Sequence, residues 1–258
     1  MDYQIFNEDC ISGMKKLDDG SVDAIICDPP FQTTDASWDI RLPIEEMWAE
    51  FNRVTKQNAA IVLFSQLPFA VDLINANRKM FRYEWIWTKS KAVGFLNANR
   101  MPMRAHENIL VFYRKLPTYN PQFRTGKPYV RIQDEEPRTR ESVYQGRGSS
   151  ITINDGNHYY PRDVLEYSQP TTNNKMEPRF HPTQKPVDLM EFLVRTYTNE
   201  GELVLDSTTG SGSTGVACMK SRRRFVGFEL NKKFYDVSRQ RLERAINERD
   251  QNLFEVRS

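Results

Sequence analysis

The chain has 258 residues, of which 39% are hydrophobic and 12% aromatic, enough to bury the core of one elaborated domain. Its 36 Lys and Arg nearly balance its 34 Asp and Glu, so a basic tail protein is excluded and any nucleic-acid affinity must come from local clusters. No apolar run is long enough for a membrane span, the N-terminus lacks a signal-peptide pattern, and the three cysteines lack C-x-x-C spacing. We therefore expect a cytoplasmic protein with no membrane contact, disulfide framework or zinc site.

Short β-branched or aromatic runs alternate with a helical pattern over residues 1–114, which is typical of an α/β sheet. Strands are predicted at residues 22–27, 59–64, 83–88 and 108–113, and an amphipathic helix at residues 44–54. Trp85 and Trp87 share one face of a predicted strand, so we expect both in the core.

Residues 115–179 are polar and interrupted by prolines, and they are too many for a structureless loop in a compact domain. This region carries Arg124, Lys127, Arg131, Arg138, Arg140 and Arg147, with tyrosines interleaved among them. Because arginines neutralise phosphates and aromatic rings stack on bases, we expect a small irregular subdomain that binds nucleic acid. A solvated insert is the alternative.

The α/β pattern resumes after residue 180. Helices are predicted at residues 187–198, after Gly215, and at residues 232–249, and strands at residues 203–205 and 225–228.

The segment L-V-L-D-S-T-T-G-S-G-S-T-G, at residues 203–215, contains a G-x-G-x-x-G that could bind a dinucleotide. Only residues 216–258 follow it, so the rest of the sheet must come from upstream. Asp206 precedes the glycines, where a carboxylate would repel a pyrophosphate but suits a cationic ligand such as the amino group of S-adenosylmethionine. The motif lacks the Lys-Ser/Thr ending of a P-loop. A tight turn without a ligand is the alternative.

Asp28-Pro29-Pro30-Phe31 follows a predicted strand at its carboxyl end, where open α/β sheets place their ligands. The prolines remove N–H donors and leave the Asp28 carboxylate and the Pro29 carbonyl as acceptors. Such a pair suits the exocyclic amine of a nucleobase, because two accepted N–H bonds let the nitrogen pyramidalise and turn its lone pair toward an electrophile. Phe31 would stack on the extruded base. A simple proline turn is the alternative.

Together these motifs resemble those of the DNA amino-methyltransferases, which transfer a methyl group from S-adenosylmethionine to adenine N6 or cytosine N4. The matching segments are N-E-D-C-I (7–11), S-V-D-A-I-I-C-D-P-P-F (21–31), R-A-H-E-N-I-L-V-F (104–112), H-P-T-Q-K-P (181–186), the glycine motif, and F-V-G-F-E-L (225–230). Their order is the β-type order, with the glycine motif last. The resemblance implies a circularly permuted Rossmann-like α/β methyltransferase fold. Its catalytic half would be residues 1–114, its inserted target-recognition region 115–179, and its cofactor-binding half 180–258.

The resemblance also assigns roles to single residues. The catalytic set is Asp28, Pro29, Pro30 and Phe31. The cofactor-binding set is Asp9, Cys10, Ile11, His181, Thr183, Lys185, Asp206, Gly210, Gly212, Thr214 and Glu229. Within it, Glu229 is expected at the ribose hydroxyls, and Thr183 and Lys185 at the methionine carboxylate. The six basic residues of the central region would contact duplex DNA, no metal is required, and a homodimer is compatible with the family. Ser207-Thr208 replaces an apolar pair common there, so the packing of this loop is expected to differ.

The preferred reading is a DNA adenine-N6 methyltransferase of a bacterial or phage-infected cell, as found in restriction-modification, because N4-cytosine enzymes usually have Ser before Pro-Pro. Four alternatives stay open: an N4-cytosine enzyme, an enzyme acting on amino groups of RNA or protein, a DNA-binding regulator without turnover and, most distantly, an NAD-dependent oxidoreductase. C5-cytosine chemistry is disfavoured because no Pro-Cys dipeptide supplies a nucleophile.

Overall fold

The computed structural model describes residues 2–32, 41–133, 149–171 and 178–255. The chain divides into two compact units, a larger one made of Met1–Asn120 and Asp163–Ser258 and a smaller one made of Pro121–Arg162. The smaller unit is therefore an insertion in the sequence of the larger. Among the described residues, no helix is both long enough and apolar enough to cross a bilayer.

The larger unit contains an eight-stranded sheet with the order β1-β10-β9-β2-β3-β5-β4-β8. Its strands are β1 (Tyr3–Phe6), β2 (Val22–Cys27), β3 (Thr55–Ser65), β4 (Phe81–Val93), β5 (Arg104–Phe112), β8 (Val164–Tyr167), β9 (Leu203–Asp206) and β10 (Arg224–Phe228). All neighbours are parallel except the β3–β5 and β5–β4 pairs, which are antiparallel.

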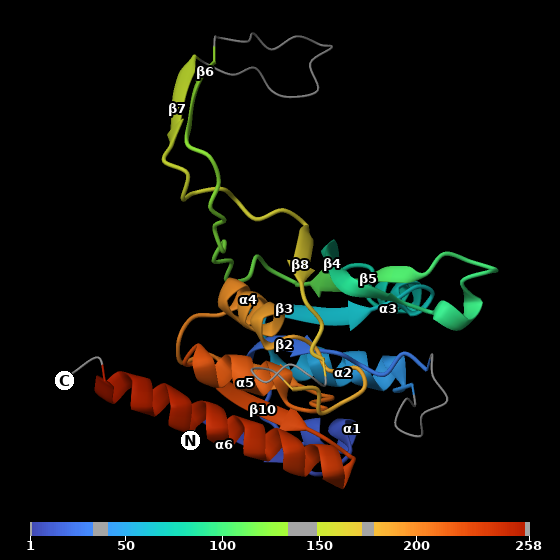
Figure 1. The fold of residues 1–258 in the computed structure, drawn as a ribbon. Helices are drawn as coiled ribbons and strands as arrows, with labels where there is room; N and C mark the ends of the chain where they lie inside the picture. The colour runs from blue at the N-terminus through green and yellow to red at the C-terminus, as the bar shows by residue number, and fades with distance from the viewer. Residues whose placement is uncertain (1, 33–40, 134–148, 172–177, 256–258) are drawn as a thin grey trace. The chain divides into compact units, whose positions relative to one another are not determined.

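Strands from the two ends of the chain interleave in this sheet. β2 pairs with β9 on one side and with β3 on the other, and β1 pairs with β10. In Figure 1 the red and orange C-terminal elements accordingly lie beside the blue N-terminal ones. The strands missing after the glycine motif are thus supplied by the N-terminal part of the chain, as the permuted fold predicts.

Helices cover both faces of the sheet, because the strands alternate their apolar side chains between two cores. Ile26 and Val62 pack with α4 (Val187–Tyr197), α5 (Ser213–Lys220) and α6 (Lys232–Glu255). Ile25 and Ile61 pack with α1 (Cys10–Met14), α2 (Ile44–Val54) and α3 (Phe69–Ala76) on the other face. Trp85 and Trp87 are both buried, which confirms the prediction for them.

The predicted strands and helices of the larger unit are present, but several begin or end at other residues than predicted. β3, β4 and β5 extend beyond the apolar runs that predicted them, since ladder pairing continues into polar residues. The helix expected after Gly215 begins earlier, at Ser213, because Gly212 takes a left-handed conformation (φ 84°) that ends the preceding loop. β1, α1, α3 and β8 are too short for their patterns to have been recognised.

The smaller unit contains one two-stranded antiparallel ribbon, β6 (Tyr129–Gln133) with β7 (Ser150–Asn154). Arg124 pairs with Tyr159 through backbone hydrogen bonds of 2.8 and 3.1 Å, which close the base of this unit. Arg124, Lys127 and Arg131 are exposed. The other basic residues predicted to bind DNA, Arg138, Arg140 and Arg147, lie outside the described residues. The predicted recognition region, residues 115–179, also contains β8, which belongs to the sheet of the larger unit.

Candidate active site

The D-P-P-F motif and the glycine motif emerge at the same edge of the sheet. β2 and β9 are adjacent and parallel, with Ala24 opposite Val204. Asp28 follows the last residue of β2, and Asp206 is the last residue of β9, so both lie at the carboxyl ends of neighbouring strands. Both residues line one cavity of about 1200 Å³. The topology therefore unites, in one cavity, two motifs that lie far apart in the sequence.

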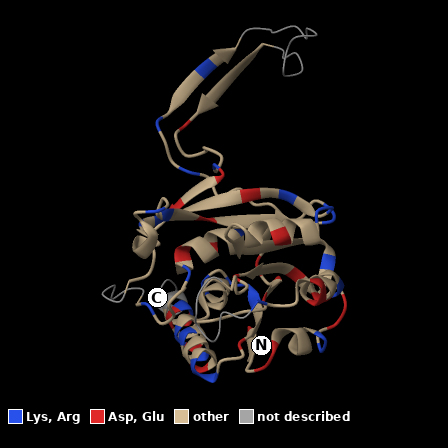
Figure 2. Cartoon of the chain, turned by 90° about the vertical axis from the view of Figure 1, so that its right-hand side faces the viewer, with Lys and Arg blue, Asp and Glu red and all other residues tan. Residues whose placement is uncertain are grey.

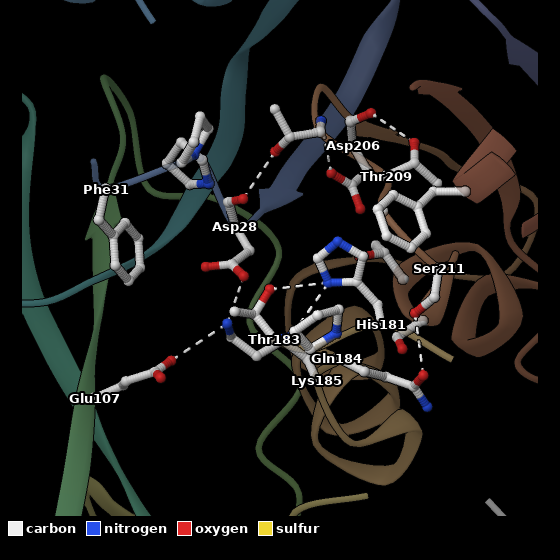
Figure 3. A pocket seen from close by; sticks show the side chains of 18 of the residues that line it. Asp28, Phe31, Glu107, His181, Thr183, Gln184, Lys185, Asp206, Thr209 and Ser211 are labelled. Carbon is white, nitrogen blue, oxygen red and sulfur yellow. Dashed lines mark hydrogen bonds and ion pairs between the residues drawn. The ribbon is translucent and has the colours of Figure 1, made fainter. Parts of the chain in front are cut away.

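Asp28 has one carboxylate oxygen engaged and the other available. Oδ2 accepts a hydrogen bond from Lys185 Nζ, as Figure 3 shows. Oδ1 is buried and has no hydrogen-bond partner among the described residues. Since an unpartnered buried acceptor is costly, Oδ1 is a strong candidate for a ligand N–H or O–H.

The rest of the D-P-P-F motif also lines the cavity, as the assignment of Pro29, Pro30 and Phe31 requires. Phe31 is half-buried, and its ring packs on Phe69 of α3 with centroids 5.4 Å apart. This contact holds the ring in place while leaving part of it open to a planar ligand.

Asp28 ends a row of four alternating charges that the sequence reading did not foresee. Lys185 Nζ lies between Asp28 and Glu107, at 3.3 Å from Glu107 Oε2 (Figure 3). Lys89 Nζ lies 2.5 Å from Glu107 Oε1. Buried charges persist only when paired, and here two ammonium groups balance two carboxylates. Lys185, predicted at the cofactor carboxylate, thus makes its ion pairs with Asp28 and Glu107.

The row sets the ionisation of its members. Burial raises the pKa of Asp28 to about 6, and Lys185 opposes this shift while Glu107 adds to it. Burial alone would lower the pKa of Lys185 and raise that of Glu107, but the neighbouring opposite charges outweigh it, so the pKa of Lys185 is raised and that of Glu107 is lowered. At neutral pH Asp28, Lys185 and Glu107 are therefore charged.

The Ser207-Thr208 pair, where the family commonly has apolar residues, joins the two motifs. Thr208 Oγ1 donates to the backbone carbonyl of Asp28 at 2.9 Å, and Ser207 Oγ lies 3.5 Å from Cys27 Sγ. Because Ser207 and Thr208 replace apolar residues, their hydroxyl groups link the glycine loop to the segment Cys27–Asp28 by two hydrogen bonds.

Removal of the hydrogen bond from Thr208 to the Asp28 carbonyl is expected to destabilise the fold modestly. Thr208→Val keeps the shape of the side chain but deletes the donor to Asp28, so we expect the free energy of unfolding to fall by about 1 kcal/mol in urea denaturation. Thr208→Ser, which retains the hydroxyl, should recover most of it. A serine variant as unstable as the valine variant would instead assign the loss to the missing methyl contact.

The glycine loop surrounds a second buried carboxylate, Asp206. Burial raises the pKa of Asp206 to about 7, although hydrogen bonds from Thr214 and from the backbone N–H of Thr208 oppose the shift. Gly210 takes a left-handed φ of 55°, and its N–H donates to Glu229 Oε2 at 2.8 Å. Glu229 directly follows β10 and also accepts from Asn231 N–H at 2.7 Å. Two acids thus flank the loop, and within the described part of the chain no basic residue forms an ion pair with Asp206.

The H-P-T-Q-K-P segment forms a compact turn before α4. Thr183 donates to His181 Nδ1 from both its N–H (3.2 Å) and, where the tautomer permits, its hydroxyl (3.0 Å). The His181 ring packs on Phe234, and burial with nearby Lys185 and Arg179 lowers the pKa of His181 to about 4. Gln184 accepts from the N–H of Phe180 at 2.8 Å and donates to the Pro178 carbonyl at 3.1 Å. The segment is therefore held rigidly, and His181 is neutral at physiological pH.

Most predicted site residues come together at the cavity. Those of the cofactor set that line it are Asp9, Cys10, His181, Thr183, Lys185, Asp206, Gly210, Thr214 and Glu229. Ile11 packs in the core, and Gly212 packs against α6, where an added Cβ would lie 2.8 Å from the Cβ of Ser238. The structure gives these two residues packing contacts rather than places in the cavity wall.

Comparisons with known proteins agree with this geometry. A family model described as DNA methylase (N6_N4_Mtase) matches residues 22–240. The type II methyltransferase M.HpaI of Haemophilus parainfluenzae is 28% identical over 260 residues, covering 96% of this chain and 76% of M.HpaI. The DNA adenine methyltransferase YhdJ of Escherichia coli K12 is 26% identical over 271 residues, covering 98% of this chain and 87% of YhdJ. The crystal structure of the M1.HpyAVI–SAM complex has a TM-score of 0.62 at 24% identity, covers 93% of this chain and 100% of its own, and confirms the predicted fold.

Proposed function

Since the chain belongs to the DNA methylase family, we propose that it transfers a methyl group from S-adenosylmethionine to N6 of an adenine extruded from duplex DNA at a specific site. The observation that carries this proposal is Asp28 Oδ1, a buried acceptor without a partner among the described residues, on a cavity that the glycine motif also lines. A base must leave the helix to reach such an enclosed site.

Asp28 and Pro29 position the amine. Asp28 Oδ1 accepts one N–H of the adenine amino group and the Pro29 carbonyl accepts the other, which draws the nitrogen lone pair out of conjugation with the ring. Phe31 stacks on the base. The nitrogen then forms its bond to the methyl carbon while the carbon–sulfur bond breaks and its electron pair stays on sulfur. One amine proton leaves, through Asp28 or water, as the new N–C bond forms. Lys185 holds Asp28 in the orientation that leaves Oδ1 available.

The cavity also fits the methyl donor. When bound, S-adenosylmethionine supplies an electrophilic methyl group on a sulfonium sulfur. The buried Asp206 carboxylate suits its ammonium group, and Glu229 suits its ribose hydroxyls. Asp9, the N-cap of α1, accepts from Ser12 N–H at 2.9 Å, and we place the adenine ring of the donor near this residue and Cys10.

Cofactor affinity is expected to depend on pH through Asp206. The free protein holds Asp206 with a pKa of about 7, and a bound ammonium group favours the carboxylate. Affinity for S-adenosylmethionine should therefore be full above pH 7 and fall as the pH drops below 7. Asp206→Asn should weaken binding by roughly 10- to 100-fold at pH 8 and abolish this dependence, as measured by calorimetry. Asp18→Asn, at an exposed residue outside the cavity, is the control. Unchanged affinity in Asp206→Asn would remove Asp206 from the cofactor site.

A labelled methyl assay tests the proposed reaction. Purified protein is incubated with methyl-labelled S-adenosylmethionine and duplex DNA, RNA or protein, and the DNA is digested to nucleosides and separated. Label in N6-methyladenine supports the proposal. Label only in N4-methylcytosine, preferential label in RNA or protein, or DNA retention without transfer would each favour the corresponding alternative.

The smaller unit is proposed to contact DNA through its exposed basic residues, including Arg124, Lys127 and Arg131. Such contacts release counterions, so each charge-removing substitution should reduce the salt dependence of DNA binding by about one counterion. A homodimer is also proposed from the family resemblance, and sedimentation equilibrium tests it.

A further inference from the structure

The connection between β4 and β5, residues 94–103, exposes large apolar side chains, and we name it the rim loop. Phe95 is 77% exposed and Leu96 is 91% exposed, and Met101 and Met103 are exposed as well. Gly94, with a φ of 96°, turns the chain into a short 3-10 helix, Phe95–Asn97, that carries the first two. In Figure 1 this green segment projects beyond the ends of β4 and β5. Apolar side chains gathered in this way on a surface usually meet a partner.

The rim loop lies at the mouth of the active-site cavity. Lys91, Val93, Gly94 and Arg104, which flank or begin the loop, all line the cavity and are all exposed. Arg104 donates to Gln66, another cavity residue, at 2.5 Å. Phe95 and Leu96 therefore follow directly after residues of the cavity wall.

The charged side chains in the sequence segment that contains the rim loop are all basic. Residues 89–106 include Lys89, Lys91, Arg100 and Arg104 but no Asp or Glu. Lys89 is buried in its pair with Glu107, whereas the other three are exposed. Along α6, by contrast, basic and acidic side chains are mixed, as Figure 2 shows. Duplex DNA offers a partner for both kinds of side chain, because cations can contact its phosphates and apolar side chains can contact its stacked bases.

We propose that the rim loop binds the duplex at the target site, with Phe95 and Leu96 entering the gap in the base stack and Lys91, Arg100 and Arg104 contacting the flanking phosphates. This inference rests on the proposed function, because only an enzyme that extrudes a base creates such a gap. Extrusion exposes the faces of the neighbouring base pairs, and an apolar side chain placed against them offsets part of the lost stacking.

The first test uses the double variant Phe95→Ser/Leu96→Ser, with Val71→Ser as the matched control, since Val71 is an exposed apolar residue of α3 in the same unit and does not line the cavity. Methylation is measured on a duplex that contains the mapped target adenine and on the same duplex with an abasic site opposite that adenine. We expect the double variant to lose about tenfold or more in kcat/KM on the paired duplex and to regain most of it on the abasic one, where extrusion is easier. No loss, or an equal loss on both duplexes, would overturn the inference.

The second test does not depend on methyl transfer. In Phe95→Trp, stacking of the new indole on bases should quench its emission when duplex DNA binds, whereas Val71→Trp should show no such change. A protein that transfers no methyl group but shows the quenching would refute the proposed reaction and retain the DNA contact. Absence of quenching in Phe95→Trp would overturn the proposed contact between the rim loop and DNA. A change from dimer to monomer in the double serine variant would also overturn it, because the loop would then be an interface between two copies of the chain.

Discussion

Asp28→Ala is expected to lower kcat for DNA methylation by roughly 10³-fold while S-adenosylmethionine binding stays close to wild type. The substitution removes the buried Oδ1 acceptor, so the amine keeps its lone pair conjugated into the base. Single-turnover methyl transfer measures the chemical step, and calorimetry measures cofactor binding.

The control for this variant is Asp18→Ala, at an exposed residue outside the cavity. Retained cofactor affinity shows that the alanine variant has folded. A kcat within a fewfold of wild type would contradict the role of Asp28, and a loss of cofactor affinity that matched the loss of activity would assign Asp28 to the cofactor instead.

Substitutions in the charge row are expected to move the acidic limb of the pH–rate profile in opposite directions. In the proposed mechanism methyl transfer requires the Asp28 carboxylate. Because the pKa of this group is raised to about 6, activity should be full above pH 6 and decline as the pH falls through this value. Lys185→Met removes the cation that favours the carboxylate, and the limb should move to higher pH by about one unit or more. Glu107→Gln removes a neighbouring negative charge, and the limb should move to lower pH.

The paired variants also separate two roles for Lys185. A cation that holds Asp28 shifts the pH profile, whereas a cation that binds the methionine carboxylate raises the KM for S-adenosylmethionine without shifting it. Removing one partner of a buried ion pair costs about 3–5 kcal/mol, so circular dichroism must accompany Lys185→Met. If Lys185→Met unfolds, the pH–rate profile of Glu107→Gln still tests the role of the charge row. Lys220→Met, at an exposed lysine, is the control.

The motifs predicted the fold because they fixed the order of its strands. A glycine motif near the C-terminus required strands from upstream, and β1, β2 and β3 provide them. The sites at the ends of β2 and β9 could likewise be predicted, because parallel neighbours place their carboxyl ends together.

The charge row was beyond the sequence alone, since its members come from four separate segments. Lys89 ends the apolar part of β4, Glu107 lies in β5, and Lys185 precedes α4. Glu107 had one visible signal, a carboxylate immediately before the strand predicted at residues 108–113, but no spacing in the sequence relates it to Asp28. Glu107 reaches the cavity because β5 pairs with β3 in the sheet, and Lys185 reaches it through the turn before α4.

The most direct test of the central claim is methyl-sensitive single-molecule sequencing of unmethylated DNA treated with the purified protein and S-adenosylmethionine, with Asp28→Ala in parallel. The account predicts N6-methyladenine at one defined sequence motif with the wild-type protein and none with the variant. DNA left unmodified by a wild-type protein that binds S-adenosylmethionine would contradict it, as would modification confined to cytosine.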